Sequence, residues 1–260
     1  DGHADAFAAF HNARPPAPRW QQDWFPRLDG AMAYAMVRHL RPPRIVEVGS
    51  GHSSRFMMRA IADAGYDCDF TAIDPAPRAD LDGLAGLTLL RRPVQEVGEA
   101  PFRALQAGDI LFIDSSHILM PGSDVDLLFN RVLPALPAGV LVHIHDISLP
   151  DDYPAAWGWR GYNEQLGVIP LITGGGYQLE WSSWYVARHM AGALDGRPLA
   201  ALSLAGILIA LAGVPVLAAY KSLFVGAFGS KFAITETLTR ATPLIVTGLA
   251  AAVAFRARIW

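Results

Sequence analysis

Residues able to do chemistry gather in four short blocks of the sequence, and each block directly follows an apolar run. The blocks are Glu47 to Gly51, Asp74, Asp114 to His117, and His145-Asp146. Glycines let a backbone turn sharply and approach a ligand closely. A carboxylate such as Asp74 can hold both hydroxyls of a ribose, and a histidine can take up a proton near neutral pH. These residue types indicate a site that binds a nucleoside-like group and moves a proton.

The apolar runs are predicted to be strands of one sheet. Strands are expected at about 44–48, 69–74, 87–90, 109–114 and 139–144, and one or two more within 177–186. Helices are expected at about 29–39, 53–64, 97–105 and 124–136. Strands alternating with helices form βαβ units, which build a parallel sheet covered on both faces. The predicted fold class is therefore α/β, with a doubly wound, mostly parallel Rossmann-like sheet followed by an α-helical hydrophobic tail.

The four blocks should meet at one edge of this sheet, because ligands of open α/β sheets bind at the carboxyl ends of the strands. Three of the four blocks also have a purely structural alternative. The glycines can serve a tight strand–helix turn, Asp74 can cap a turn before Pro75, and His117 can cap the next helix. A dinucleotide-binding GxGxxG motif is incomplete, since Ser54 stands at the third glycine position, and this weakens a nicotinamide-cofactor interpretation.

The runs RIVEVGSGHSS and TAIDP, with DILFIDSSH and GVLVHIHDISLPDDYP, resemble class I S-adenosylmethionine-dependent methyltransferases over about residues 29–188. They are similar to the methyltransferase 24 type, which is related to the catechol O-methyltransferases. The resemblance implies a set of cofactor-binding residues at the strand ends: Glu47, Gly49, Ser50, Gly51, Asp74, Gln95 and Asp114. The block before position 52 would surround the methionine part, Asp74 would hold the ribose, and Gln95 would flank the adenine.

The same resemblance bears on a metal and on a base. Related catechol enzymes hold magnesium with two aspartates and an asparagine, where this sequence has Asp114, His145 and Asp146. A histidine ligand favours manganese, iron or zinc over magnesium, so magnesium, a softer divalent ion and no metal all stay open. His117 stands where the family has a lysine base. The expected catalytic residues are therefore His117 and Asp114, with a neutral imidazole removing a proton from the acceptor.

Charge and composition divide the chain into two parts. Residues 197–260 hold six Lys and Arg and one acidic residue, whereas residues 1–196 hold 15 basic and 23 acidic residues. An acidic first part lacks the basic face that nucleic-acid binding needs, so no nucleic-acid partner is expected. Cys68 stands alone, which excludes an internal disulfide and fits a reducing compartment. The first ten residues show no signal-peptide pattern.

The C-terminal tail, residues 191–260, contains long uncharged stretches. Residues 198–220 form a run of 23 uncharged residues, long enough to span a membrane as a helix, and residues 241–255 form a shorter one of 15. The stretch GAFGSKFAITETLTRATPLIVTGLA resembles the start of a permease subunit of ABC importers for nucleosides and simple sugars, over about residues 199–260. Two interpretations stay open: a membrane anchor for the enzyme, or a fusion of two reading frames.

The sequence therefore predicts a lead-in at 1–28, irregular in structure, a methyltransferase domain at 29–190 and a transmembrane permease-like segment at 191–260. The expected activity is methyl transfer from S-adenosylmethionine to an O or N nucleophile of a small-molecule or glycan-type acceptor, covered by the Trp- and Tyr-rich loop 151–165. The expected location is cytoplasmic, with the tail anchored in the inner or plasma membrane. A ligand-binding component of a transporter and an NAD-dependent oxidoreductase are the alternatives, and the oligomeric state is open.

Overall fold

The structure, a computed structural model, describes residues 3–11, 13–25 and 27–190. The chain separates into one compact unit at Asp1–His189 and a second at Met190–Trp260. The predicted membrane spans at 198–220 and 241–255, and the permease resemblance, thus lie outside the described residues and stay predictions. Within the described ranges, no helix is both long and apolar enough to cross a membrane.

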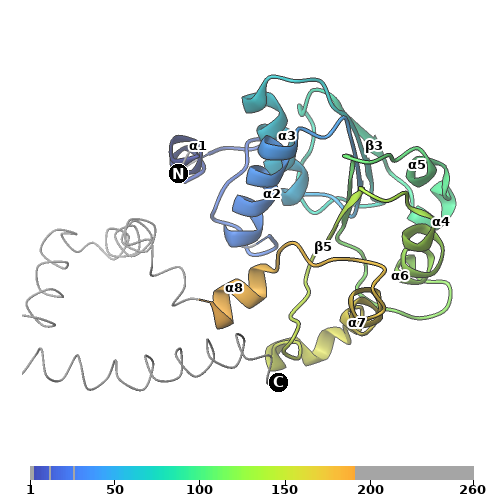
Figure 1. Cartoon of the computed structure of the whole chain (residues 1–260). Helices are drawn as coiled ribbons and strands as arrows, with labels where there is room; N and C mark the ends of the chain where they lie inside the picture. Colours follow the sequence, from blue (N-terminus) through green and yellow to red (C-terminus); the bar gives the residue numbers. More distant parts are fainter. Residues whose placement is uncertain (1–2, 12, 26, 191–260) are drawn as a thin grey trace, which may run out of the picture. The chain divides into compact units, whose positions relative to one another are not determined.

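Five parallel strands form one sheet in the order β3-β2-β1-β4-β5 (Figure 1). The strands are β1 Arg44–Val48, β2 Asp69–Ile73, β3 Leu87–Leu90, β4 Ile110–Ile113 and β5 Leu141–Ile144. This confirms the α/β, Rossmann-like prediction. The order reverses beside β1, between β2 and β4, and such a switch point is where open α/β sheets bind ligands.

Helices flank this sheet, α2 and α3 on the left of Figure 1 and α4, α5 and α6 on the right. The α-helices are α1 Ala4–Ala9, α2 Arg27–Leu40, α3 His52–Ala64, α4 Val94–Val97, α5 Ala100–Arg103, α6 Asp124–Leu127, α7 Gln165–Thr173 and α8 Ser183–His189. A π-helical turn at Leu128–Val132 and short 3₁₀ segments at Leu133–Ala135 and Ala155–Arg160 complete the elements. The helix predicted at 97–105 is shorter in the structure, where only α5 lies within this range. The helix before it, α4, ends at Val97 because Gly98 follows in a conformation with positive φ.

Two hydrophobic cores follow from the alternation of side chains along each strand. Ile45 of β1 and Phe112 of β4 belong to the core beneath α2 and α3. Their neighbours Val46 and Ile113 belong to the core on the other side. Successive strand residues point to opposite faces, so a continuous apolar run buries both. This is why the strands read as unbroken apolar runs in the sequence.

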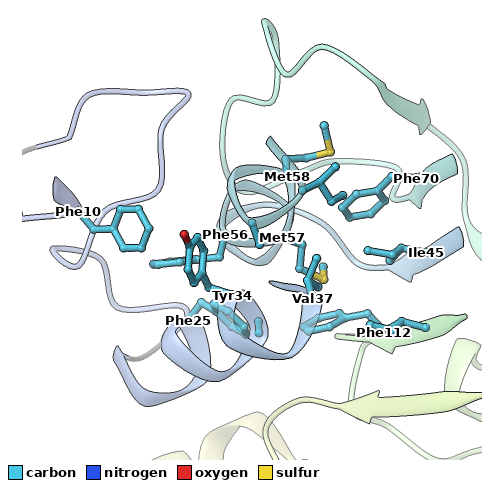
Figure 2. Close-up of a cluster of buried hydrophobic side chains, with 14 of the residues drawn as sticks. Phe10, Phe25, Tyr34, Val37, Ile45, Phe56, Met57, Met58, Phe70 and Phe112 are labelled. Carbon is cyan, nitrogen blue, oxygen red and sulfur yellow. The ribbon is translucent and has the colours of Figure 1, made fainter. Parts of the chain in front are cut away.

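The lead-in is not irregular throughout, contrary to expectation. It contains α1, and its Phe10, Trp20 and Phe25 are buried in the first core. Figure 2 shows Phe10 and Phe25 near Phe56 of α3, and the rings of Phe10 and Phe56 meet edge to face with centroids 5.4 Å apart. The N-terminal segment therefore closes the outer side of the core that α2 and α3 form.

The late strands predicted within 177–186 are wrong. The chain there has no strand, and residues 183–189 form α8. The aromatic and β-branched residues that suggested a strand instead form an exposed segment and one turn of helix packed beside α2, with only Val186 buried. Residues with high strand propensity form a strand only where a partner strand and a buried face are available, and this segment has neither.

Removing the ring of Phe10 tests whether the lead-in is part of the folded core. Phe10→Ala is expected to lower the free energy of unfolding by about 3–5 kcal/mol, because Phe10 is fully buried. Urea denaturation measures the change. The matched control is Met120→Ala, at a side chain that is 56% exposed, where the change should stay within about 0.5 kcal/mol. An equally small loss in both variants would contradict the packing described.

Candidate active site

A cavity of about 370 Å³ lies at the carboxyl edge of the sheet. Four of the sequence blocks border it, since residues following β1, β2, β4 and β5 all line it. The structure therefore brings the predicted strand-end residues together. The residues from the predicted set that line the cavity are Gly49, Ser50, Gly51, Asp74, Gln95, Asp114, His117 and Asp146.

The glycine turn after β1 is held by its neighbour strand. The N–H of Asp114 donates to the Val48 carbonyl at 2.8 Å, and a Cβ added at Gly49 would overlap the Asp114 carbonyl oxygen. Gly49 also has φ +78°, a left-handed conformation that favours glycine. Glycine at 49 is thus required by the close approach of two strand ends.

Glu47 lies behind this turn and does not line the cavity. It is fully buried, and its two carboxyl oxygens accept hydrogen bonds from Ser53 and Ser54 at 2.6 Å each. Burial raises the pKa of Glu47 to about 8 although the two serine hydrogen bonds oppose the rise. In the structure Glu47 fixes the start of α3 through these serines, and its predicted contact with the methionine part stays a prediction.

Asp74 and Ser50 form the opposite wall. One oxygen of Asp74 accepts from the Ser50 N–H at 2.6 Å and from the Ser50 hydroxyl at 3.1 Å, and the other accepts from the Ala76 N–H at 2.8 Å. Carboxylate oxygens each have two acceptor sites, so Asp74 keeps capacity for a ligand hydroxyl. Gln95 lies farther along the same cavity and donates to the Gly122 carbonyl at 3.3 Å.

Two histidines and two aspartates form a compact charged cluster after β4 and β5. Asp114 Oδ1 lies 3.2 Å from both His117 Nε2 and His145 Nδ1. Asp146 lies 3.6 Å from each imidazole, reaching His117 with Oδ2 and His145 with Oδ1. On the far side, His145 Nε2 is 3.5 Å from Asp29 of α2. The predicted catalytic and metal-ligating residues are therefore within contact distance of one another.

Charge compensation controls protonation in this cluster. Burial disfavours a charged ring, but hydrogen bonds to Asp114 and Glu164 outweigh it and raise the pKa of His117 to about 9. Asp114 likewise raises the pKa of His145 well above its usual value, against the effect of burial. In turn, both imidazoles outweigh burial and lower the pKa of Asp114. The free cluster therefore holds charged imidazoles at neutral pH, unlike the neutral His117 that the sequence predicted.

Backbone strain coincides with this cluster. His117 has φ +62° and Asp146 has φ +55°, left-handed conformations that are uncommon for residues other than glycine, although Asp and His adopt them more often than most. Such residues cost about 1–3 kcal/mol each and persist where surrounding contacts over-determine them, most often at functional sites. The strain at these two strand ends supports a functional role for both side chains.

The predicted metal ligands Asp114, His145 and Asp146 lie close together, but the ring nitrogens of His145 are directed at carboxylates, Nδ1 at Asp114 and Nε2 at Asp29. A ligating imidazole must be deprotonated, so His145 would have to lose a ring proton to bind a metal. Across the described part of the chain, no three His, Cys, Asp or Glu side chains are grouped to hold a metal. Metal ligation by these residues therefore stays a prediction.

Several cavity residues come from outside the predicted strand-end set. The lead-in supplies Asp23, Trp24 and Phe25, which were not predicted, and the loop expected to cover the acceptor supplies Trp157 and Arg160. The Arg160 guanidinium lies 4.4 Å from the centre of the Trp157 ring. The Trp and Tyr content of loop 151–165 signalled the second group, whereas no sequence pattern ties the lead-in to the strand ends.

A parallel sheet with a glycine turn after β1 and an aspartate after β2 defines a nucleoside-binding Rossmann-like domain. Residues 46–147 match the model of a family described as a methyltransferase domain. No curated protein and no solved structure matches the chain. The chain thus carries a class I S-adenosylmethionine-dependent methyltransferase domain and is an enzyme. The match does not reach residues 199–260, and nothing found supports the permease resemblance, the transporter alternative or the NAD-dependent alternative.

Replacing Gly49 tests the close approach of the two strand ends. Gly49→Ala is expected to destabilise the chain by more than about 3 kcal/mol, because the added methyl group overlaps the Asp114 carbonyl and the backbone is left-handed. Thermal unfolding measures the loss. Gly65→Ala is the matched control, since Gly65 has φ +61° and no atom within 4 Å of an added Cβ. There only the conformational cost of about 1–2 kcal/mol remains, and equal losses would contradict the contact.

The charged His117 predicts a pH dependence of stability. A histidine pKa raised from 6.5 to about 9 stabilises the fold fully below 6.5, and the contribution is lost as pH rises through about 9. Wild-type stability minus that of His117→Gln should thus fall, by on the order of 3 kcal/mol, between about pH 6 and about pH 9.5. Urea denaturation at both pH values measures this. A difference that is constant or grows with pH would contradict the charged state.

Proposed function

We propose that this enzyme transfers the methyl group of S-adenosylmethionine to an O or N nucleophile of a small-molecule or glycan-type acceptor. One observation carries the proposal: the residues that follow β1, β2, β4 and β5 line a single cavity. Ser50 and Asp74, which we assign to binding the nucleoside, line one part of its wall. Asp114 and His117, which we assign to proton transfer, line another. A donor and an acceptor can therefore meet between them.

The residues present suit the cofactor. The cavity volume of about 370 Å³ falls within the range of about 300–1,000 Å³ that ligand sites occupy. The turn at Gly49 to Gly51 presents backbone without side chains, and the Asp74 carboxylate keeps free acceptor capacity for ribose hydroxyls. In this proposal Ser50 and Gly51 lie along the methionine part, Asp74 holds the ribose and Gln95 flanks the adenine.

The chain's own part in the reaction is alignment and proton transfer. S-adenosylmethionine, when bound, supplies a methyl group carried on a positively charged sulfur, which keeps the bonding electrons and becomes a neutral thioether when the methyl group is transferred. His117 lines the cavity, and its Nε2 lies 3.2 Å from Asp114, which also lines it, while its Nδ1 lies 2.8 Å from Glu164. A neutral His117 would accept the nucleophile's proton at Nε2, and the charged Asp114 would stabilise the imidazolium formed. Alignment of the nucleophile with the methyl group contributes the remaining acceleration.

The raised pKa sets the condition for this step. Because the pKa of His117 is about 9 in the free enzyme, only a small part of His117 is neutral at pH 7. Turnover is therefore expected to increase as pH rises toward about 9. The aromatic loop would cover the acceptor, since Tyr162 packs on His117 with ring centroids 4.5 Å apart and Trp157 lines the same cavity.

Binding of S-adenosylhomocysteine tests the cofactor assignment. Wild-type protein is expected to bind it in calorimetry, and Asp74→Asn should weaken binding by about 10- to 100-fold, because a charged hydrogen bond to the ribose is lost. Asp69→Asn is the matched control, since Asp69 lies at the opposite end of β2 and is paired with Arg44. No binding by folded wild-type protein would refute the proposal.

Acceptor class is tested by turnover. A panel of a phenol, a primary amine and a simple sugar is incubated with S-adenosylmethionine, and release of S-adenosylhomocysteine is followed from about pH 7 to about pH 9.5. Loss of turnover in His117→Gln with retained cofactor binding would support His117 as the base. Full activity of that variant would remove it from the reaction.

A further inference from the structure

Glu164 is a buried carboxylate to which neither the sequence nor the match assigns a role. It is completely buried directly before α7, and it lies 47 residues along the chain from His117. A carboxylate at this place commonly caps its own helix, yet the Glu164 side chain makes no capping hydrogen bond with α7. Its carboxyl group is directed at the catalytic cluster instead.

The carboxyl group of Glu164 pairs with His117 and with the neighbouring serine. Its Oε2 lies 2.8 Å from His117 Nδ1, and its Oε1 accepts a hydrogen bond from the Ser115 hydroxyl at 2.9 Å. Both oxygens are thus committed to the loop that carries the base. A buried charge without such partners would be strongly unfavourable, so these contacts explain why a carboxylate is tolerated there.

Main-chain bonds join the same two segments. The carbonyl of His117 accepts from the N–H groups of Asn163 and Glu164, at 3.0 and 3.2 Å. Asn163 also accepts from the Leu119 N–H at 2.6 Å. These bonds hold His117 in its left-handed conformation at φ +62°, which is uncommon for residues other than glycine. Segment 163–164 thus fixes both the backbone and the ring of His117.

We propose that Glu164 is the positioning residue of this enzyme: it holds the proton on His117 Nδ1 and aims Nε2 at the bound acceptor. The proposal rests on the proposed function, in which His117 is the base. Which nitrogen of a histidine reacts is set by the hydrogen bond that the other nitrogen makes. With Nδ1 donating to Glu164, the nitrogen left for proton transfer is Nε2, which lies beside Asp114, and His117 and Asp114 both line the cavity. Glu164 does not itself line the cavity, so it acts through His117.

Two substitutions separate charge from shape. Glu164→Gln keeps an oxygen that can accept from Nδ1–H but removes the charge, whereas Glu164→Ala removes the partner altogether. The matched control is Asp109→Asn: Asp109 is also buried and accepts two hydrogen bonds, from the N–H groups of Arg44 and Gln106, but it precedes β4 at the other edge of the sheet. Its replacement tests what loss of any buried carboxylate does.

Nuclear magnetic resonance of the ¹⁵N-histidine-labelled full chain gives the first readout and needs neither cofactor nor acceptor. The wild type should show a downfield Nδ1–H proton of His117, assigned by its loss in His117→Asn. This resonance should vanish in Glu164→Ala, move in Glu164→Gln and remain in Asp109→Asn. An unchanged resonance in a folded Glu164 variant would overturn the proposal. Should Glu164→Ala fail to fold, Glu164→Gln decides alone.

Turnover gives the second readout, with the acceptor that the panel identifies. We expect kcat to fall by about 10²-fold in Glu164→Ala and about 10-fold in Glu164→Gln, because general-base catalysis contributes about 10²–10⁴-fold. KM for both substrates and S-adenosylhomocysteine affinity should stay within about threefold, since Glu164 touches neither ligand. An unchanged kcat in both variants would contradict the proposal. If wild type binds no S-adenosylhomocysteine, the proposed function fails, while the resonance still tests the Glu164–His117 pair.

Discussion

The contact between the backbone of Gly49 and the carbonyl of Asp114 determines where the rest of the site can lie. Neighbouring strands β1 and β4 leave the sheet side by side, and their ends stay this close only because position 49 has no side chain. The turn at 49–51 then faces Asp74 on one side, and the loop from Asp114 to His117 faces β5 on the other. One absent methyl group therefore lets the nucleoside side and the acceptor side share one cavity.

The second constraint is the balance of buried charge. Carboxylates and imidazoles alternate through the site from Asp29 to His145, Asp114, His117 and Glu164, with neighbouring groups 2.8 to 3.5 Å apart. Each buried charge is thus faced by an opposite one, which offsets much of the cost of burial. Both rings share Asp114 and Asp146, while Asp29 of α2 faces only His145 and Glu164 faces only His117, so each ring's protonation depends on groups from separate segments of the chain.

Much of the fold was predictable because its signal is local. Each predicted strand is a short apolar run bounded by Gly, Pro or Asp. Such runs are typical of strands in a parallel sheet, because both faces of that sheet are buried. The cavity edge followed from the same pattern, since polar residues after parallel strands share one edge. The Tyr177–Val186 segment misled because strand propensity without a partner strand has no effect. Trp24 and Glu164 reach the site by long-range packing, which no spacing in the sequence records.

The resemblance to metal-dependent catechol enzymes indicated where the charged residues lie, and the side chains at those positions differ from the ones that hold magnesium in that family. In such an arrangement an ion neutralises carboxylates at the ends of two strands. Here His145 replaces one carboxylate, and its ring nitrogens are directed to Asp114 and Asp29, so an imidazolium supplies the positive charge from within the protein. The imidazolium of His117 supplies a second positive charge, beside Asp114 and Glu164. Histidines that supply positive charge here can also move protons, and the orientation of their rings is then the property that the surrounding residues control.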